Sequence, residues 1–162
     1  MTERIAVETV ETDLGPMVVA SSSRGVVAVV AGRDEAALVA GIRRRVPGAE
    51  IVAAASPHAP WLVGWAAAAR RDPPPLDLRG LTPFDADVYR FVAGLAWGER
   101  ATYGDVAVAV GRPGAARAVG GAMGRCPLFP AVPCHRVVRA VDGWSGWGGS
   151  DDLKRRLLER EG

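Results

Sequence analysis

The stretch Asp72-Pro73-Pro74-Pro75 divides this chain of 162 residues into two parts with different patterns. Three consecutive prolines cannot continue a helix, and they favour an extended linker. Strand patterns dominate before this stretch, whereas helical patterns dominate after it. The prolines therefore predict an N-terminal α/β subdomain, residues 1–75, and a C-terminal subdomain, residues 76–162.

The residues before the proline run predict a small sheet with two helices. Alternation of polar and apolar residues is typical of half-buried strands, and apolar spacing of three and four is typical of helices. Strands are expected over residues 5–10, 16–20 and 26–30, and residues 50–54 could form another strand. Helices are expected over residues 34–46 and 60–71.

The residues after the proline run predict three helices. Thr82 is a favourable N-cap, Pro83 suits the first helical position, and helical apolar spacing continues to Leu95. Two shorter helices are expected over residues 103–110 and 114–123. Because a short turn containing a glycine joins them, the pair matches a helix-turn-helix. Many helical hairpins bind nothing, so this pattern alone leaves nucleic-acid binding open.

The last of these helices is unusually rich in small residues. Within it Gly120 and Gly121 are adjacent, and each glycine costs about 1 kcal/mol relative to alanine. A helix that accepts this cost is expected to approach another surface closely. That surface could be a neighbouring helix, or it could be a DNA groove with Arg117 as the one long cation.

The motif Pro133-Cys134-His135-Arg136-Val137-Val138 contains a candidate nucleophile. A thiolate is the reactive form of cysteine, and neighbouring His and Arg side chains can lower the pKa of a thiol. Adjacent side chains diverge, so contact between Cys134 and His135 would need a turn or a bridging water. For a cysteine considered by itself, the alternative is an inert buried thiol.

Composition excludes several classes of protein. The formal net charge is +2, which permits nucleic-acid binding but does not argue for it. Cys126 and Cys134 are too few for a disulfide framework or a cysteine-rich zinc site, and His58 stands alone, so no metal is expected. No signal peptide and no run of roughly 18 apolar residues is present, which predicts a soluble cytoplasmic protein without membrane association. Lys154 is the only lysine.

The motif at Cys134, together with the run Arg117–Met123, resembles the O6-alkylguanine-DNA alkyltransferases. The similarity extends from Thr82 to Glu161 and so covers the C-terminal half. It implies an α/β (α+β) fold with a small ribonuclease-H-like, three-stranded N-terminal subdomain and a helical C-terminal subdomain containing the helix-turn-helix. It also implies a monomer without a cofactor.

The resemblance implies DNA repair by a methylated-DNA-protein-cysteine S-methyltransferase. Such a protein flips the damaged base out of double-stranded DNA, because the reacting carbon is out of reach inside the duplex. The alkyl group of O6-alkylguanine passes irreversibly to a cysteine in a single turnover, and O4-alkylthymine is a further candidate substrate. The partner is therefore expected to be double-stranded DNA carrying alkylated guanine.

Catalytic roles follow from the same resemblance. Cys134 matches the acceptor, His135 would act as base through a water, and Glu161 would orient that histidine. Tyr103 matches the tyrosine that protonates or hydrogen-bonds the departing guanine. Such a relay applies the logic of a catalytic triad with a water inserted.

Other residues are implied in DNA and substrate binding. Arg117 matches the finger that replaces the flipped nucleotide in the stack. The remaining expected DNA contacts are Thr102, Ala115, Ala116 and Gly120. The expected substrate pocket is lined by Arg136, Val137, Trp147 and Gly148. In this pocket the backbone carbonyls of Cys134 and Val137 would accept from the guanine amine.

Some positions depart from the family pattern. Cys126 stands where an asparagine is usual, Trp147 where a tyrosine is usual, and Gly148 where a serine is common. Two alternatives therefore stay open. One is a non-enzymatic alkyltransferase-like protein that binds alkylated bases and signals to other repair pathways. The other is a relative that acts on a substrate other than DNA.

Overall fold

The computed structural model describes residues 3–141 and 151–162, with the backbone alone at Asp151. Two compact units are present. The first contains residues 1–81 and 127–131, and the second contains residues 82–126 and 132–162. The mixed α and β content agrees with the predicted fold class.

The first unit extends six residues beyond the expected boundary at Pro75. The chain there continues to bond with the sheet, because the Val26 amide donates to Pro75 O and the Asp77 amide donates to Val26 O, both within 2.9 Å. The Arg45 guanidinium also donates to the backbone carbonyls of Asp77 and Arg79. These bonds explain why the segment after the prolines packs with the strands.

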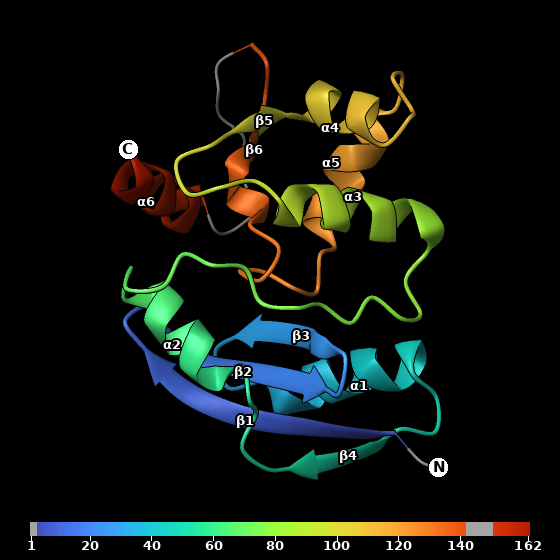
Figure 1. Ribbon diagram of the computed structural model, residues 1–162, viewed down its shortest axis with the longest axis vertical. Coiled ribbons are helices and arrows are strands. Elements are labelled where there is room, and N and C mark those ends of the chain that lie inside the picture. Colours follow the sequence, from blue (N-terminus) through green and yellow to red (C-terminus); the bar gives the residue numbers. More distant parts are fainter. Residues whose placement is uncertain (1–2, 142–150) are drawn as a thin grey trace. The chain divides into compact units, whose positions relative to one another are not determined.

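The first unit contains a sheet of four strands rather than three (Figure 1). Strands β1 Arg4–Thr12, β2 Gly15–Ser22 and β3 Gly25–Ala31 form an antiparallel meander. Strand β4, Glu50–Ala53, pairs parallel with β1 and completes the order β3-β2-β1-β4. A helical crossover between β3 and β4 makes this parallel pairing geometrically accessible.

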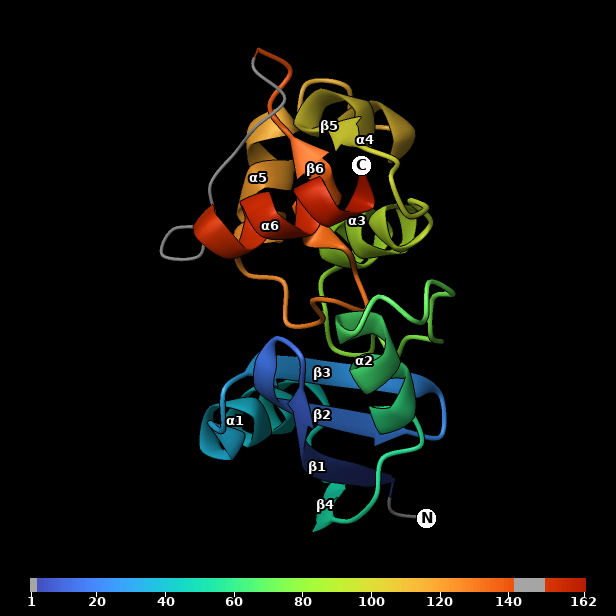
Figure 2. The ribbon, with the colours of Figure 1, turned by 90° about the vertical axis from the view of Figure 1, so that its left-hand side faces the viewer.

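Two helices cover opposite faces of this sheet (Figures 1 and 2). Helix α1, Glu35–Arg45, is capped by the Asp34 side chain, and helix α2 covers Ala59–Ala66. The expectation that α2 extends to residue 71 is wrong. The helix ends at Ala66, and Ala68, two residues further on, has a positive φ of 59°.

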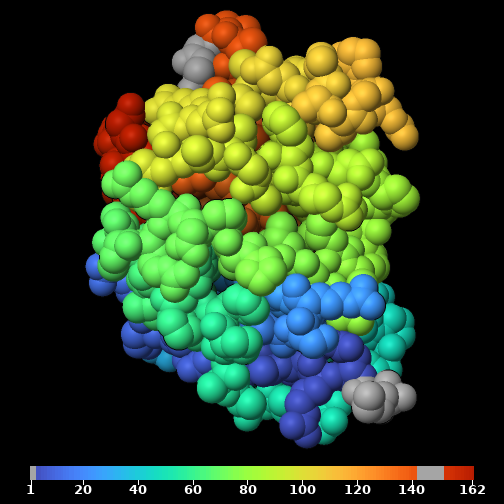
Figure 3. All heavy atoms as spheres, in the orientation of Figure 1, coloured from blue at the N-terminus to red at the C-terminus, as the bar shows by residue number. Residues whose placement is uncertain are grey.

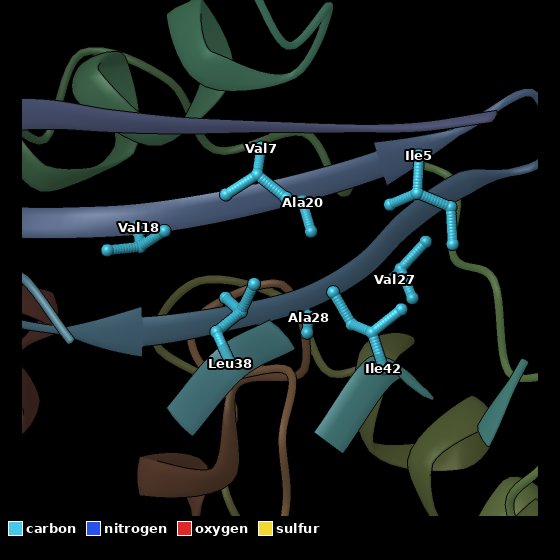
Figure 4. Close-up of a cluster of buried hydrophobic side chains, with 8 residues drawn as sticks. All are labelled: Ile5, Val7, Val18, Ala20, Val27, Ala28, Leu38 and Ile42. Carbon is cyan, nitrogen blue, oxygen red and sulfur yellow. The ribbon is translucent and has the colours of Figure 1, made fainter. Parts of the chain in front are cut away.

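The core beneath α1 follows from strand alternation (Figure 4). Alternate residues of β1, Ile5 and Val7, point from the sheet toward α1, where Leu38 and Ile42 point back toward the sheet. The cluster is completed by Val18, Ala20, Val27 and Ala28. Burial of these side chains, and not helix propensity alone, holds α1 on the sheet.

The second unit is mainly helical. Helix α3, Pro83–Ala93, starts at the predicted cap, since Thr82 accepts a hydrogen bond from the Asp85 amide. Helices α4, Tyr103–Ala109, and α5, Ala116–Gly124, form the predicted helical hairpin.

The remaining elements of the second unit were not predicted as elements. Strands β5, Ala101–Thr102, and β6, Val137–Val138, pair in parallel, and a 3₁₀ turn, η1, covers Cys134–Arg136. Helix α6, Asp151–Glu161, lies beside β6 and η1 (Figure 2). Among the described residues, no helix has the length and apolar content that a membrane span requires.

Candidate active site

Cys134 begins the 3₁₀ turn at the centre of the second unit. Its side chain is only 2% exposed, and the thiol donates to the Val132 carbonyl at 3.3 Å. The Val137 amide donates to the Cys134 carbonyl and closes the turn before β6. The local backbone therefore holds the sulfur inside the unit, just ahead of a short paired strand.

His135 and Glu161 form a buried pair, although 26 residues separate them in the sequence. His135 Nε2 lies 2.6 Å from Glu161 Oε2, and both side chains are almost fully buried. Arg136 Nε also donates to Glu161 Oε1 at 2.8 Å, and its Nη1 donates to the Leu95 carbonyl. Glu161 additionally accepts from the Gly98 amide. The last turn of α6 is thereby fastened to η1 and to the loop after α3.

The protonation states of this pair follow from its surroundings. Burial opposes a charge on Glu161, but the hydrogen bonds from His135 and Arg136 outweigh it and bring the pKa of Glu161 to about 2. Burial lowers the pKa of His135, although Glu161 acts in the opposite direction. At neutral pH the imidazole is therefore neutral, and Nε2–H donates to the carboxylate. This tautomer makes Nδ1 the nitrogen that can accept a proton.

The expectation that neighbouring His and Arg lower the pKa of the Cys134 thiol is wrong. Hydrogen bonding with Cys126 and burial raise the pKa of Cys134, and the positive charge of Lys154 only partly opposes them. The reason is geometric, because the side chains of His135 and Arg136 are directed to Glu161. The resting cysteine is thus a protonated thiol that needs a base to become nucleophilic.

Tyr103 is the first residue of α4, and its ring lies against α5. A Cβ at Gly120 would lie 3.9 Å from Tyr103 Cε1, which is an ordinary van der Waals contact, so the ring lies beside the helix without requiring a glycine there. Thr102 caps α4, because its hydroxyl accepts from the Asp105 amide while Asp105 accepts from the Thr102 amide. The position of Tyr103 therefore depends on this capping box.

Arg117 lies in the first turn of α5 and is exposed. Ala115, Ala116 and Gly120 are partly exposed on the same helix and its N-cap, and the preceding turn, residues 111–114, is exposed (Figure 3). A Cβ at Gly121 would meet only the end of the Arg125 side chain. Packing inside the unit therefore does not explain the adjacent glycines.

The residues predicted to line the substrate pocket differ in burial and contacts, and two of them lie outside the described residues. Val137 is buried in β6, directly after η1. The Arg136 side chain binds Glu161 and Leu95, so its observed contacts support the His–Glu pair, and contact with substrate stays a prediction. Trp147 and Gly148 lie outside the described residues.

Comparison with known proteins identifies the family. The family model described as "6-O-methylguanine DNA methyltransferase, DNA binding domain" matches residues 83–162. A methylated-DNA–protein-cysteine methyltransferase of Mycobacterium tuberculosis is 48% identical over 86 residues, 53% of this chain and 52% of that protein. The crystal structure of an M. tuberculosis O6-methylguanine methyltransferase has a TM-score of 0.76 at 30% identity, covering 97% of this chain and 92% of that one. The chain belongs to the O6-alkylguanine-DNA alkyltransferase family.

A second solved structure adds a partner for a family member. The M. tuberculosis protein named OGT, crystallised in complex with DNA, is 30% identical with a TM-score of 0.75, covering 96% of this chain and 92% of that one. This chain spans about half the length of the curated relatives it matches. Within the described residues, no three His, Cys, Asp or Glu side chains are placed to share a metal ion.

Several residues around the candidate site were not predicted from the sequence. The Lys154 side chain is fully buried, and its Nζ donates to the Val137 carbonyl at 2.9 Å. Arg160 and Arg136 lie over the ring of Trp97, 4.9 and 5.9 Å from its centroid. A signal for Lys154 existed, since it is the only lysine in a chain with 19 arginines. No comparable signal marks Trp97, whose contacts arise only on folding.

Proposed function

We propose that this protein repairs DNA by transferring an alkyl group from O6 of guanine to Cys134, irreversibly and once per molecule. The observation that carries this proposal is the buried set of Cys134, a neutral His135 and an ionised Glu161, joined to His135 by a 2.6 Å contact. Membership of the alkyltransferase family supports the same chemistry. Double-stranded DNA containing an alkylated guanine is the proposed substrate.

The reaction proceeds as a displacement at the alkyl carbon. The Cys134 thiol passes its proton through a water to His135 Nδ1, and Glu161 stabilises the resulting imidazolium. The sulfur forms a bond to the alkyl carbon while the bond from that carbon to O6 breaks, and the electron pair stays with guanine. The Tyr103 hydroxyl donates a hydrogen bond to the departing base. Cys134 ends as a stable thioether, which explains the single turnover.

DNA binding is proposed for the exposed start of α5. Arg117 would fill the gap that the flipped nucleotide leaves, and the small residues Ala115, Ala116 and Gly120 would allow α5 to approach the groove. Thr102 would contact DNA beside its role as N-cap. Val137 and Arg136, with Trp147 and Gly148, would form the pocket for the flipped base.

Mass spectrometry after incubation with a duplex containing O6-methylguanine tests the proposal. We expect the protein to gain one methylene unit at Cys134, and we expect Cys134→Ala to bind the duplex with no gain. Cys126→Ala is the matched control and should still be methylated at Cys134. Binding without any gain in mass would support a non-enzymatic alkyltransferase-like protein instead. Methylation of Cys126 in the Cys134→Ala variant would overturn the choice of nucleophile.

A further inference from the structure

The Lys154 side chain has an unusual position for a lysine. It is fully buried, and Nζ donates to the backbone carbonyl of Val137 at 2.9 Å. Lysine is almost never fully buried unless its charge is paired or hydrogen-bonded, because removal from water disfavours the ammonium group. An apolar side chain would fill the same volume without that penalty. The burial of Lys154 therefore needs a reason beyond packing.

Helix α6 supplies two ionised side chains to the same short segment. Lys154 and Glu161 are seven residues apart, so they lie on one face of the helix about two turns from each other. Leu157 and Leu158, both buried, occupy that face between them. Lys154 binds the end of the Cys134–Val137 segment, and Glu161 binds its middle through His135 and Arg136. One helix thus fixes the segment at both points.

The signs of these two charges match the charges that proton transfer creates. When the proton moves from Cys134 to His135, the sulfur becomes negative and the imidazole becomes positive. Glu161 already lies against the imidazole, and the positive charge of Lys154 favours the thiolate of Cys134. Fixed charges of this kind stabilise a developing charge without any reorganisation during the reaction.

We propose that Lys154 is a positioning residue for alkyl transfer, which orients the Val137 carbonyl and stabilises the Cys134 thiolate. This inference rests on the proposed function for the role of the carbonyl, since that oxygen is the expected acceptor for the guanine amine. A carbonyl oxygen has two lone pairs, so Lys154 and the base can be bound together. The effect on the thiolate holds for any electrophile that reaches Cys134.

Other ionisable groups face the same thiol from neighbouring elements. Cys126, after α5, raises the pKa of Cys134 by its hydrogen bond, and burial acts in the same direction. Tyr89 of α3 has a raised pKa, first through burial and then through the charges of Cys126, Asp85 and Cys134. The positive charge of Lys154 opposes these effects at Cys134. Its removal should therefore disfavour the thiolate.

The test compares Lys154→Met, which removes the charge, with Lys154→Arg, which keeps it. The parent, both variants and the control all carry Cys126→Ser, because Cys126 raises the pKa of Cys134 and would itself be labelled. Iodoacetamide labelling followed by mass spectrometry then reports on Cys134. The labelling rate of Cys134 is measured against pH, together with methyl transfer from duplex O6-methylguanine and thermal unfolding. Arg156→Met is the matched control, because it removes an exposed positive charge from the same helix.

We expect Lys154→Met to shift the labelling profile to higher pH by about one unit, which is a tenfold loss of thiolate below the pKa. Methyl transfer should slow by at least about tenfold, and Lys154→Arg and Arg156→Met should keep the profile of the parent protein. An unchanged profile in a folded Lys154→Met protein would overturn the proposal, as would the same shift in Arg156→Met. If the parent protein fails to transfer methyl groups, the proposed function fails, whereas the labelling profile still decides the role of Lys154.

Discussion

His135 and Arg136 both bind the carboxylate of Glu161 in the second unit. Glu161 is the penultimate residue of the chain, and termini usually tolerate substitution unless they are held by contacts. Here the Glu161 side chain is 2% exposed and accepts from His135 Nε2, from the Arg136 guanidinium and from the Gly98 amide. Through these contacts Glu161 anchors α6 as well as the histidine.

Substitution Glu161→Gln should lower both the rate of transfer and the stability. The amide keeps the shape but loses the charge that stabilises the imidazolium, and it leaves the buried Arg136 without its anion. We expect a loss of roughly 1–3 kcal/mol in the free energy of unfolding. The rate should fall by a smaller factor as the pH is raised above 7, because a growing fraction of the thiol then ionises without a base, although the raised pKa of Cys134 keeps that fraction low.

A pH–rate profile measured beside thermal unfolding checks this prediction. Glu159→Gln is the control, since Glu159 is exposed on the same helix. A Glu161→Gln protein that melts like the parent and has the same profile would remove Glu161 from both roles.

Substitution Arg117→Ala should separate base flipping from chemistry. Arg117 is exposed at the start of α5, whereas the side chains of the His135–Glu161 pair are buried. Transfer from duplex DNA should slow at least about tenfold, while transfer from free O6-benzylguanine should stay near that of the parent, because a free base needs no flipping. Single-turnover rates on both substrates measure this, with Arg90→Ala as an exposed control. Equal losses on the two substrates would make Arg117 a structural residue.

Among the helices and strands, α4 affects the candidate site because its first turn positions Tyr103. The reciprocal bonds between Thr102 and Asp105 satisfy amides that the helix start would otherwise leave unpaired. Tyr103 follows the cap directly, so its ring is positioned against α5 by the same bonds. A cap can thus affect transfer without contacting substrate.

Substitution Thr102→Ala should destabilise the protein by about 1 kcal/mol, because the hydroxyl that accepts from the Asp105 amide is lost. Transfer to Cys134 should slow at the same time, since Tyr103 loses its fixed position. Thr102→Ser keeps a hydroxyl and should restore both quantities most of the way. Chemical denaturation and single-turnover kinetics make the comparison, and a Thr102→Ala protein with unchanged transfer would uncouple the cap from Tyr103.

For the whole molecule, stability in acid depends on two carboxylates with a strongly lowered pKa, Asp77 in the first unit and Glu161 in the second. Asp77 in the first unit is buried, which raises its pKa, but the bonds from Arg79 and Ser22 outweigh burial and bring the pKa to about 2. Glu161 in the second unit also has a pKa of about 2. Both values lie below the ordinary values of 3.8 and 4.5. Each ionised group therefore favours the folded state.

Stability should fall as the pH is lowered from about 4.5 to about 2. A carboxylate with a depressed folded pKa contributes its full stabilisation above the unfolded pKa, and loses it as pH falls through the folded value. Melting temperatures measured across this range should drop in the parent protein. Asp77→Asn and Glu161→Gln should each be less stable at pH 6 and show a shallower drop. A melting temperature that is constant down to pH 2 would contradict the assigned ionisation.

Local rules made several features predictable from the sequence. Three of these features depend on residues close together in the chain. They are the N-cap at Thr82, the alternation of polar and apolar residues in β1 to β3, and the helical hairpin of α4 and α5. The motif around Cys134 likewise indicates a nucleophile through the types and order of its residues. Such features need only short-range sterics, hydrogen bonds and periodic burial.

Only the tertiary structure decided the features that depend on distance in space. It paired β4 with β1, brought Glu161 to His135 across 26 residues, and brought Lys154 to Val137 across 17 residues. It also reversed the expected direction of the pKa shift of Cys134, because the hydrogen bond with Cys126 and burial outweigh the positive charge of Lys154 on α6. Sequence records which residues are neighbours along the chain. The charge state of a buried group depends on which residues surround it after folding.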